Sequence, residues 1–156
     1  MKRAGLMRGH VVAVWFFVLI GLVGCGSIRL IAPYDQRTDD AVTNLQKSTA
    51  DFFVRVERQG GSSAQDYKNQ TKFYDDAKVM LSGILVRANA ISNNEKTVQQ
   101  LEILKQQYQQ LEQQNKTIGI SQSAIPQLES AFNRTFTAIL TLEVAKKEPK
   151  AEEAGK

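Results

Sequence analysis

The chain has 156 residues, of which 20 are Lys or Arg and 16 are Asp or Glu, so its formal net charge at pH 7 is +4. This length suits a single domain, which buries roughly two-thirds of the surface that its unfolded chain exposes. The only cysteine is Cys25, so no disulfide can form within the chain and packing alone must stabilise the fold.

The first 24 residues have the organisation of a secretory signal. Lys2, Arg3 and Arg8 form a positive n-region, residues 11–20 (VVAVWFFVLI) form an apolar h-region, and small residues follow. A membrane-spanning anchor needs about 18–20 apolar residues, whereas residues 21–27 (GLVGCGS) are rich in glycine. We therefore expect a cleaved signal rather than an uncleaved anchor.

The end of this segment, Leu22-Val23-Gly24-Cys25, resembles the lipobox of bacterial lipoprotein precursors. The resemblance implies that signal peptidase recognises Leu22, Val23 and Gly24 and cleaves before Cys25. It also implies a covalent diacylglycerol on the Cys25 thiol and an N-acyl lipid on its amine, and two or three such chains hold a protein stably on a membrane. The residue after Cys25 is glycine rather than aspartate, which favours the periplasmic face of the outer membrane over the inner membrane.

Cleavage would change the composition of the protein. Removing Lys2, Arg3 and Arg8 from the 20 basic residues leaves 17 against 16 acidic ones, and these are interspersed. The remaining charge gives no basic patch for nucleic acid. Cleavage also removes His10, the only histidine, so histidine-dependent catalysis and His-ligated metal sites are excluded. We expect no metal, no cofactor besides the lipid, and no enzymatic activity.

The mature chain divides into three parts. Residues 25–37 are expected to form the lipidated cysteine and a short tether, which reaches at most roughly 40 Å. Residues 38–147 form the folded domain, and residues 148–156 (EPKAEEAGK) lack apolar periodicity, which predicts a disordered tail.

Four amphipathic segments follow the tether. Apolar residues at three- and four-residue spacings predict helices over about 38–59, 64–91, 95–117 and from 121 or 123 to 147. Gly60-Gly61 should end the first helix, and Ser62–Gln65 and Ser92–Glu95 should form capping boxes. Ser82-Gly83 lies inside the second helix, where we expect a close helix crossing or a kink.

Short connections between four helices predict an all-α fold, an antiparallel four-helix bundle. No two-residue alternation predicts a strand, and no internal sequence repeat is evident.

Few side chains suggest chemistry. Asp39-Asp40 and Asp75-Asp76 diverge by about 100° on a helix, which favours a solvated face over a shared site. Eight glutamines within residues 99–114 form either a solvent face or a partner surface. Tyr67, Tyr74 and Tyr108 are expected in the core with their hydroxyls at its rim, and Arg134 on the outer face beside an acid.

The favoured function is therefore a membrane-anchored lipoprotein whose non-enzymatic helical module acts through contacts with an unidentified protein in the cell envelope. The alternative is a carrier that holds a hydrophobic ligand between its helices. An enzyme built from carboxylates is the least favoured hypothesis.

Overall fold

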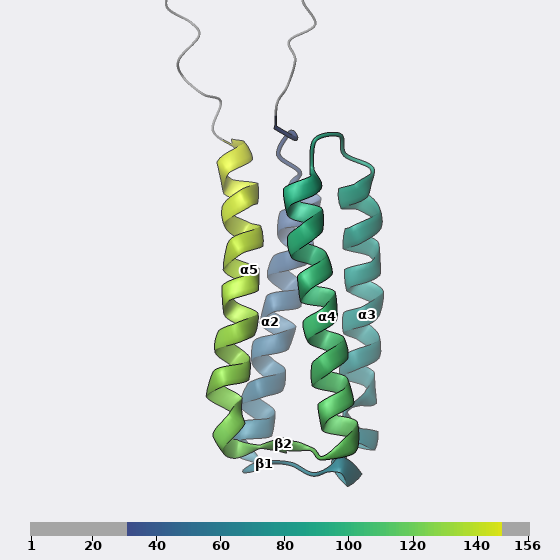
Figure 1. The fold of residues 1–156 in the computed structure, drawn as a ribbon, viewed down its shortest axis with the longest axis vertical. Helices are drawn as coiled ribbons and strands as arrows, with labels where there is room; N and C mark the ends of the chain where they lie inside the picture. The colour runs from purple at the N-terminus through teal and green to yellow at the C-terminus, as the bar shows by residue number, and fades with distance from the viewer. Residues whose placement is uncertain (1–30, 148–156) are drawn as a thin grey trace, which may run out of the picture.

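The computed structural model describes residues 31–147, which form four helices of 23 residues each: α2 (Gln36–Arg58), α3 (Tyr67–Asn89), α4 (Glu95–Thr117) and α5 (Ile125–Lys147). Each is about 35 Å long. Every helix packs against its neighbours in sequence, and α2 also packs against α5, so the bundle runs up-down-up-down (Figure 1). The predicted all-α antiparallel four-helix bundle is confirmed.

A core at heptad spacing runs through the bundle. In α2 its buried residues are Thr38, Val42, Leu45, Thr49, Phe52 and Val56, and in α4 they are Thr97, Leu101, Leu104, Tyr108, Leu111 and Asn115. The same alternation of three and four residues recurs in α3 and α5. This spacing keeps one face of each helix toward its partners over its whole length. Aromatic rings fill the centre, where Phe52 stacks on Phe73 with their centroids 4.0 Å apart.

At one end of the bundle, which we call the strand end, the two crossovers pair with each other. The strands β1 (Gly61–Ser62) and β2 (Ile120–Ser121) are antiparallel, and each leads into a single 3₁₀ turn, η1 (Ala64–Asp66) or η2 (Gln122–Ala124). Two-residue strands are too short to produce a sequence alternation, so this pair was not predicted. Gly60, Gly61 and Gly119 all have positive φ, which non-glycine residues rarely adopt.

The fold is an internal two-fold repeat. Gln36 and Glu95, the first residues of α2 and α4, are 59 residues apart, and Tyr67 and Ile125, the first residues of α3 and α5, are 58 apart. The strand pairing obeys the same relation, because Gly61 pairs with Ser121 while Ser62 pairs with Ile120. The repeat is one of backbone and register and is not evident in the sequence.

Three local predictions at helix ends and inside α3 need correction. The capping box at the strand end joins Ser63 to Asp66, one residue later than expected. No capping box forms at Ser92; Asn94 occupies the N-cap position of α4 without a side-chain capping bond, and its amide donates back to the Ala88 carbonyl at 2.9 Å. No helix crosses closely at Gly83, because a Cβ there would meet no atom within 4 Å.

We expect Gly119→Ala to destabilise the protein by at least about 2 kcal/mol. Its φ is +84°, and an added Cβ would lie 2.1 Å from the Ser62 carbonyl oxygen, so left-handed strain and a clash with backbone combine. Gly60→Ala is the matched control, since its φ is +78° with open space around the added Cβ. It should cost about 1 kcal/mol. Urea unfolding followed by circular dichroism measures both, and equal losses would contradict the close approach.

Candidate functional site

The residues that the sequence marks as functional, Leu22, Val23, Gly24 and Cys25, lie outside the described residues. The structure instead shows the end of the bundle at which the described chain begins, shortly after these residues in the sequence. Ile31, the first described residue, is six residues beyond Cys25. The start of α2 lies at the same end of the bundle as the end of α5, opposite the strands (Figure 1). We call this the entry end.

The segment that precedes α2 is attached to the bundle. Ala32 is buried and its backbone N–H donates to the Asn93 carbonyl at 3.2 Å. The Tyr34 hydroxyl donates to Asp39 at 2.8 Å, and the Lys147 ammonium lies over the Tyr34 ring, 4.4 Å from its centroid. The fixed part of the chain therefore begins near residue 32, earlier than the predicted domain boundary at residue 38.

A charged cluster then fastens α2 to α3. The Arg87 guanidinium binds both carboxylate oxygens of Asp35, with Nη2 2.6 Å from Oδ1. The Thr38 hydroxyl donates to the same carboxylate at 2.6 Å. The hydrogen bond from Arg87 holds the pKa of Asp35 at about 2, below its usual value of 3.8. Bidentate pairing of this kind fixes orientation as well as charge.

A second cluster fastens α4 to α5 and is buried. The Lys146 ammonium donates to Asn94 Oδ1 at 2.6 Å, to Thr97 Oγ1 at 2.9 Å and to the Glu143 carboxylate. Thr97 donates to Glu143 at 2.9 Å. Glu143 is fully buried and the Lys146 side chain is only 6% exposed, while Glu143 Oε2 has no partner. The two charges are therefore stabilised by each other and by the hydrogen bonds of Asn94 and Thr97.

The internal repeat makes the two clusters equivalent. Asp35 and Asn94 both precede a helix by one residue, and Thr38 and Thr97 follow three residues later. In each cluster a cation near the end of the following helix binds the residue that precedes the first helix: Arg87 of α3 binds Asp35, and Lys146 of α5 binds Asn94. Asn94 is neutral where Asp35 is charged, so the second cluster takes its anion from Glu143. The three- and four-residue apolar spacing along α5 falls on Leu142 at this turn, whereas the buried residue is Glu143.

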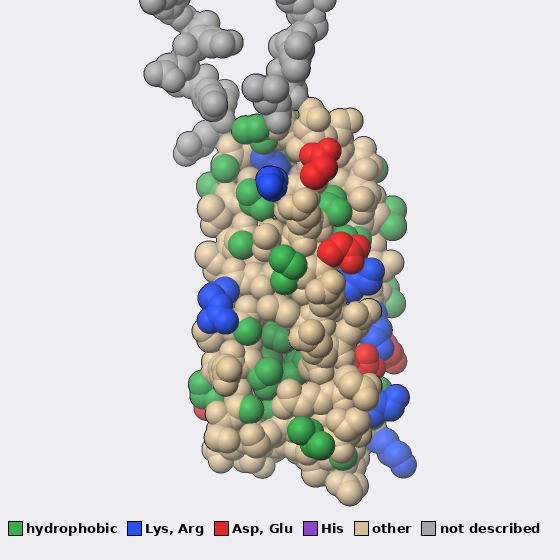
Figure 2. Space-filling model, in the orientation of Figure 1, with side chains coloured by type: hydrophobic (Ala, Val, Ile, Leu, Met, Phe, Trp, Pro, Cys, Tyr) green, Lys and Arg blue, Asp and Glu red, His purple; other side chains and the backbone are tan. Residues whose placement is uncertain are grey.

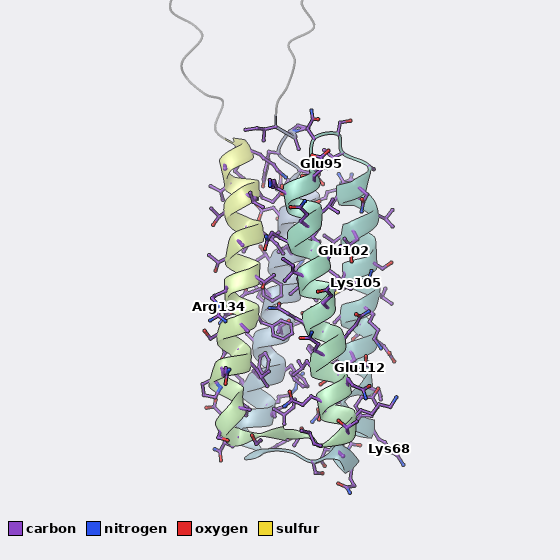
Figure 3. All side chains as sticks on the ribbon, in the orientation of Figure 1. Lys68, Glu95, Glu102, Lys105, Glu112 and Arg134 are labelled. Atoms are coloured by element: carbon purple, nitrogen blue, oxygen red, sulfur yellow. The ribbon has the colours of Figure 1, made fainter. Side chains whose placement is uncertain are left out.

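The acidic pairs do not converge on a site. Asp39 binds Tyr34 and Lys147, whereas Asp76 binds Lys72 and Asp75 lies 3.8 Å from Lys78. Arg134 points away from α5 into solvent, as predicted, but it donates to Ser130 rather than to an acid (Figure 3). Of the charged residues labelled on α4, Glu102 pairs with Lys105 at 3.1 Å on the outer side, whereas Glu112 lies toward α3 and binds Lys78 at 2.8 Å.

Two tyrosine hydroxyls are deeper than expected. Tyr74 accepts a hydrogen bond from Asn115 at 2.9 Å, and Tyr108 bonds with Thr49. Both side chains are buried, and burial raises the pKa of each hydroxyl above its usual value of 10. Only Tyr67 reaches the rim, where it donates to Glu112 at 2.9 Å. Sequence periodicity places a ring on a face but does not place its polar atom.

Most of the glutamines of α4 are exposed. Gln106, Gln109, Gln110 and Gln113 line a shallow surface hollow of about 530 Å³ with Thr117 and Ile118. Gln107 instead turns toward α5 and donates to the Ala131 carbonyl at 3.4 Å. The hollow holds neutral amides and no charge, so it offers hydrogen bonds but no electrostatic attraction.

Within residues 31–147 no three His, Cys, Asp or Glu side chains are grouped as metal ligands would be. In the same range no helix combines the length and apolarity needed to span a bilayer. No family model, curated protein or solved structure matches this chain.

We expect Asp35→Asn to remove roughly 1–2 kcal/mol at neutral pH, a figure discounted because the Arg87 side chain is 41% exposed. The folded pKa of Asp35 lies below its unfolded value, so its contribution is complete above about pH 4. It is lost as the pH falls toward 2. Urea unfolding between pH 7 and pH 2 should therefore show the variant and wild type converging in acid. Asp40→Asn, an exposed carboxylate on the same helix, is the control, and an equal effect there would contradict the assignment.

The buried pair gives a second test. Lys146→Met should cost about 3–5 kcal/mol, because it leaves the Glu143 carboxylate in the core without its cation. Adding Glu143→Leu should restore most of that loss, since Leu85 occupies the equivalent position of α3 and is buried. Urea unfolding of the single and double variants measures the coupling. Additive losses would show that the two charges do not depend on each other.

Proposed function

We propose that this protein is a lipid-anchored lipoprotein of the bacterial cell envelope whose helical bundle acts, without catalysis, through contacts with other proteins. The observation that carries the proposal is the lipobox, Leu22-Val23-Gly24-Cys25, six residues before a domain whose two described ends share one end of the bundle. A chain attached at Cys25 would enter the bundle there without crossing its length.

The attachments at the entry end support a fixed position near the bilayer. Ala32 and Asp35 are bound to the bundle, and Ala32 follows the cysteine by seven residues. Seven residue steps span at most about 25 Å. The strand end would then lie about 35 Å further out, because that is the length of each helix. Partners in the surrounding compartment would meet the sides and the strand end.

The packing of the interior favours protein contacts over a carrier role. Rings of Phe52, Phe73, Tyr74, Tyr108 and Phe132 make successive contacts with centroids 4.0–6.1 Å apart through the centre of the bundle. A carrier would hold its ligand in that space. The surface, in contrast, presents large apolar side chains that the fold leaves uncovered, among them Val79, Val86 and Ile118.

Metabolic labelling with palmitate, followed by fractionation of inner and outer membranes, tests the anchor. We expect the full chain to take up label and to sediment with the outer membrane, as the residue after Cys25 favours. Cys25→Ser should remain unlabelled and unprocessed, while its circular dichroism stays helical because the described bundle begins after it. A labelled Cys25→Ser protein, or an unlabelled wild type, would end the proposal.

A further inference from the structure

The outer side of the α2–α3 pair is hollowed near the strand end. The hollow, which we call the α2–α3 groove, has a volume of about 600 Å³ and is lined by both helices and by the turn that joins them. This volume lies within the range of ligand sites in proteins. Phe52 and Phe73, which are buried and stacked on each other, form its floor. Its walls carry polar side chains, which are Ser48, Arg55 and Gln59 from α2 and Asn69, Gln70, Lys72 and Asp76 from α3.

One charge in the α2–α3 groove has no partner. Lys72 and Asp76 bind each other at 2.6 Å. The Asp66 carboxylate, which also lines the groove, accepts hydrogen bonds from the backbone N–H and the hydroxyl of Ser63 at 2.8 and 2.7 Å. The side chain of Arg55, in contrast, forms no ion pair or hydrogen bond within residues 31–147. The groove therefore presents a planar cation whose donors are free to bind a carboxylate in pairs.

The neutral groups beside Arg55 match a peptide backbone. The side-chain amides of Gln59 and Asn69 are exposed, and each carries both a donor and an acceptor, which is what a peptide bond requires of its partner. The Gln70 amide accepts a hydrogen bond from Asn115 through its oxygen, which leaves its N–H groups to bind within the groove. A small anion would use the guanidinium alone, whereas an extended peptide with an acidic side chain would use the amides as well.

The internal repeat shows that the fold does not require this groove. The residues of α4 and α5 that are equivalent to Ser48 and Phe73 are Gln107 and Ala131. Gln107 crosses between the two helices and donates to the Ala131 carbonyl at 3.4 Å, and its side-chain oxygen is buried. Ser48 is too short to cross in the same way, so the equivalent space between α2 and α3 stays open.

Charge also distinguishes the groove from its equivalent in the second half. Figure 2 shows the face over α4 and α5, on which charged side chains are sparse and uncharged groups cover most of the surface. At the position equivalent to Arg55, α4 carries Gln114. The first half therefore combines a hollow with a free guanidinium where the second half has a neutral amide.

We propose that the α2–α3 groove binds an extended peptide segment of a partner protein, with an Asp or Glu side chain of that segment paired to Arg55. The proposal rests on the proposed function, in which the bundle acts through contacts with other proteins. The groove lies toward the strand end, which an anchor at Cys25 would hold away from the bilayer, so a partner in the surrounding compartment can reach it. The peptide lies along the floor of Phe52 and Phe73, and its backbone binds the amides of the walls.

A library of random heptapeptides displayed on phage tests the proposal. The library is selected on the full-length protein in detergent micelles, and the dissociation constants of the selected peptides are measured by fluorescence anisotropy. We expect these peptides to share an Asp or Glu at one position. Arg55→Gln should weaken their binding at least about tenfold, because a hydrogen-bonded ion pair is lost. Arg58→Gln is the matched control, because Arg58 lies in the same last turn of α2 but outside the groove. Its effect should stay below about twofold.

Replacing the shared acid of the peptide by its amide locates the pairing. On the wild-type protein this change should weaken binding as much as Arg55→Gln does. On the Arg55→Gln protein it should have no further effect, because both changes remove the same pair. Additive losses would place the acid elsewhere and overturn the pairing with Arg55.

Ser48→Gln adds a test that copies the second half of the repeat. The longer side chain should cross the groove as Gln107 crosses between α4 and α5, and the affinity for the selected peptides should fall severalfold. Circular dichroism should remain helical, because Ser48 lies at the surface of the bundle and is only partly buried. An unchanged affinity would place the peptides outside the groove and overturn the proposal.

The remaining outcomes each decide the matter. A library that yields no binding peptide, or peptides without a shared acid, would overturn the proposal. Equal losses for Arg55→Gln and Arg58→Gln would show attraction to positive charge in general and overturn the assignment to Arg55. Displacement of the peptides by free glutamate at the same concentration would assign the groove to a small carboxylate instead of a peptide. Palmitate labelling tests the anchor separately, so a failed anchor is distinguished from a failed groove.

Discussion

The pairing of β1 with β2 is the contact on which the alignment of the bundle depends. It joins the two crossovers directly, so the α2–α3 hairpin and the α4–α5 hairpin cannot shift along each other without breaking it. The pairing needs glycine, because Gly61 and Gly119 approach the opposite backbone to distances that no Cβ could occupy. Asn115 supports it from the core, accepting a hydrogen bond from Ser62 at 2.8 Å and donating to Tyr74 at 2.9 Å. The strand end therefore fixes the alignment of the two hairpins relative to each other.

The entry end is held in a different way. There is no strand pairing between its segments in the described chain, and side-chain clusters of charge take its place. Asp35 with Arg87 closes the first hairpin near the surface, whereas Asn94 and Thr97 close the second inside the core by binding the Glu143–Lys146 pair of α5. Buried charge contributes little net stability but penalises every arrangement that removes its partners. The two ends are therefore held differently: backbone pairing sets the register at one, and side-chain bonds to charged groups join the helices at the other.

Sequence periodicity was sufficient for the helices and most of the core, because heptad spacing is a property of each segment by itself. Phe52, Leu101 and Ile139 fall at that spacing in their own segments, and all three are buried in the core. It failed where a residue depends on a distant one. Glu143 is buried only because Lys146 and Thr97 donate hydrogen bonds to its carboxylate, and Gly119 is needed only because Ser62 lies opposite. The internal repeat was missed for the same reason, since register is conserved between the halves while side chains are not. The signal and the lipidated cysteine were read from local composition and stay predictions.

The differences between the halves locate where selection on function acts rather than selection on fold. A repeat built from two equivalent hairpins places equal structural demands on α3 and α5, so any pair of equivalent positions with unlike chemistry needs a reason beyond packing. The difference between Glu143 and its equivalent Leu85 has a reason inside the bundle. Glu143 supplies the negative charge that Asp35 provides in the first half and that the neutral Asn94 lacks in the second. The difference between Gly83 and its equivalent Thr141 has no such reason inside the described bundle, since neither residue is buried. The helix-propensity cost of that glycine, about 1 kcal/mol, is therefore not offset by any packing inside the described bundle, where an added Cβ would meet nothing within 4 Å.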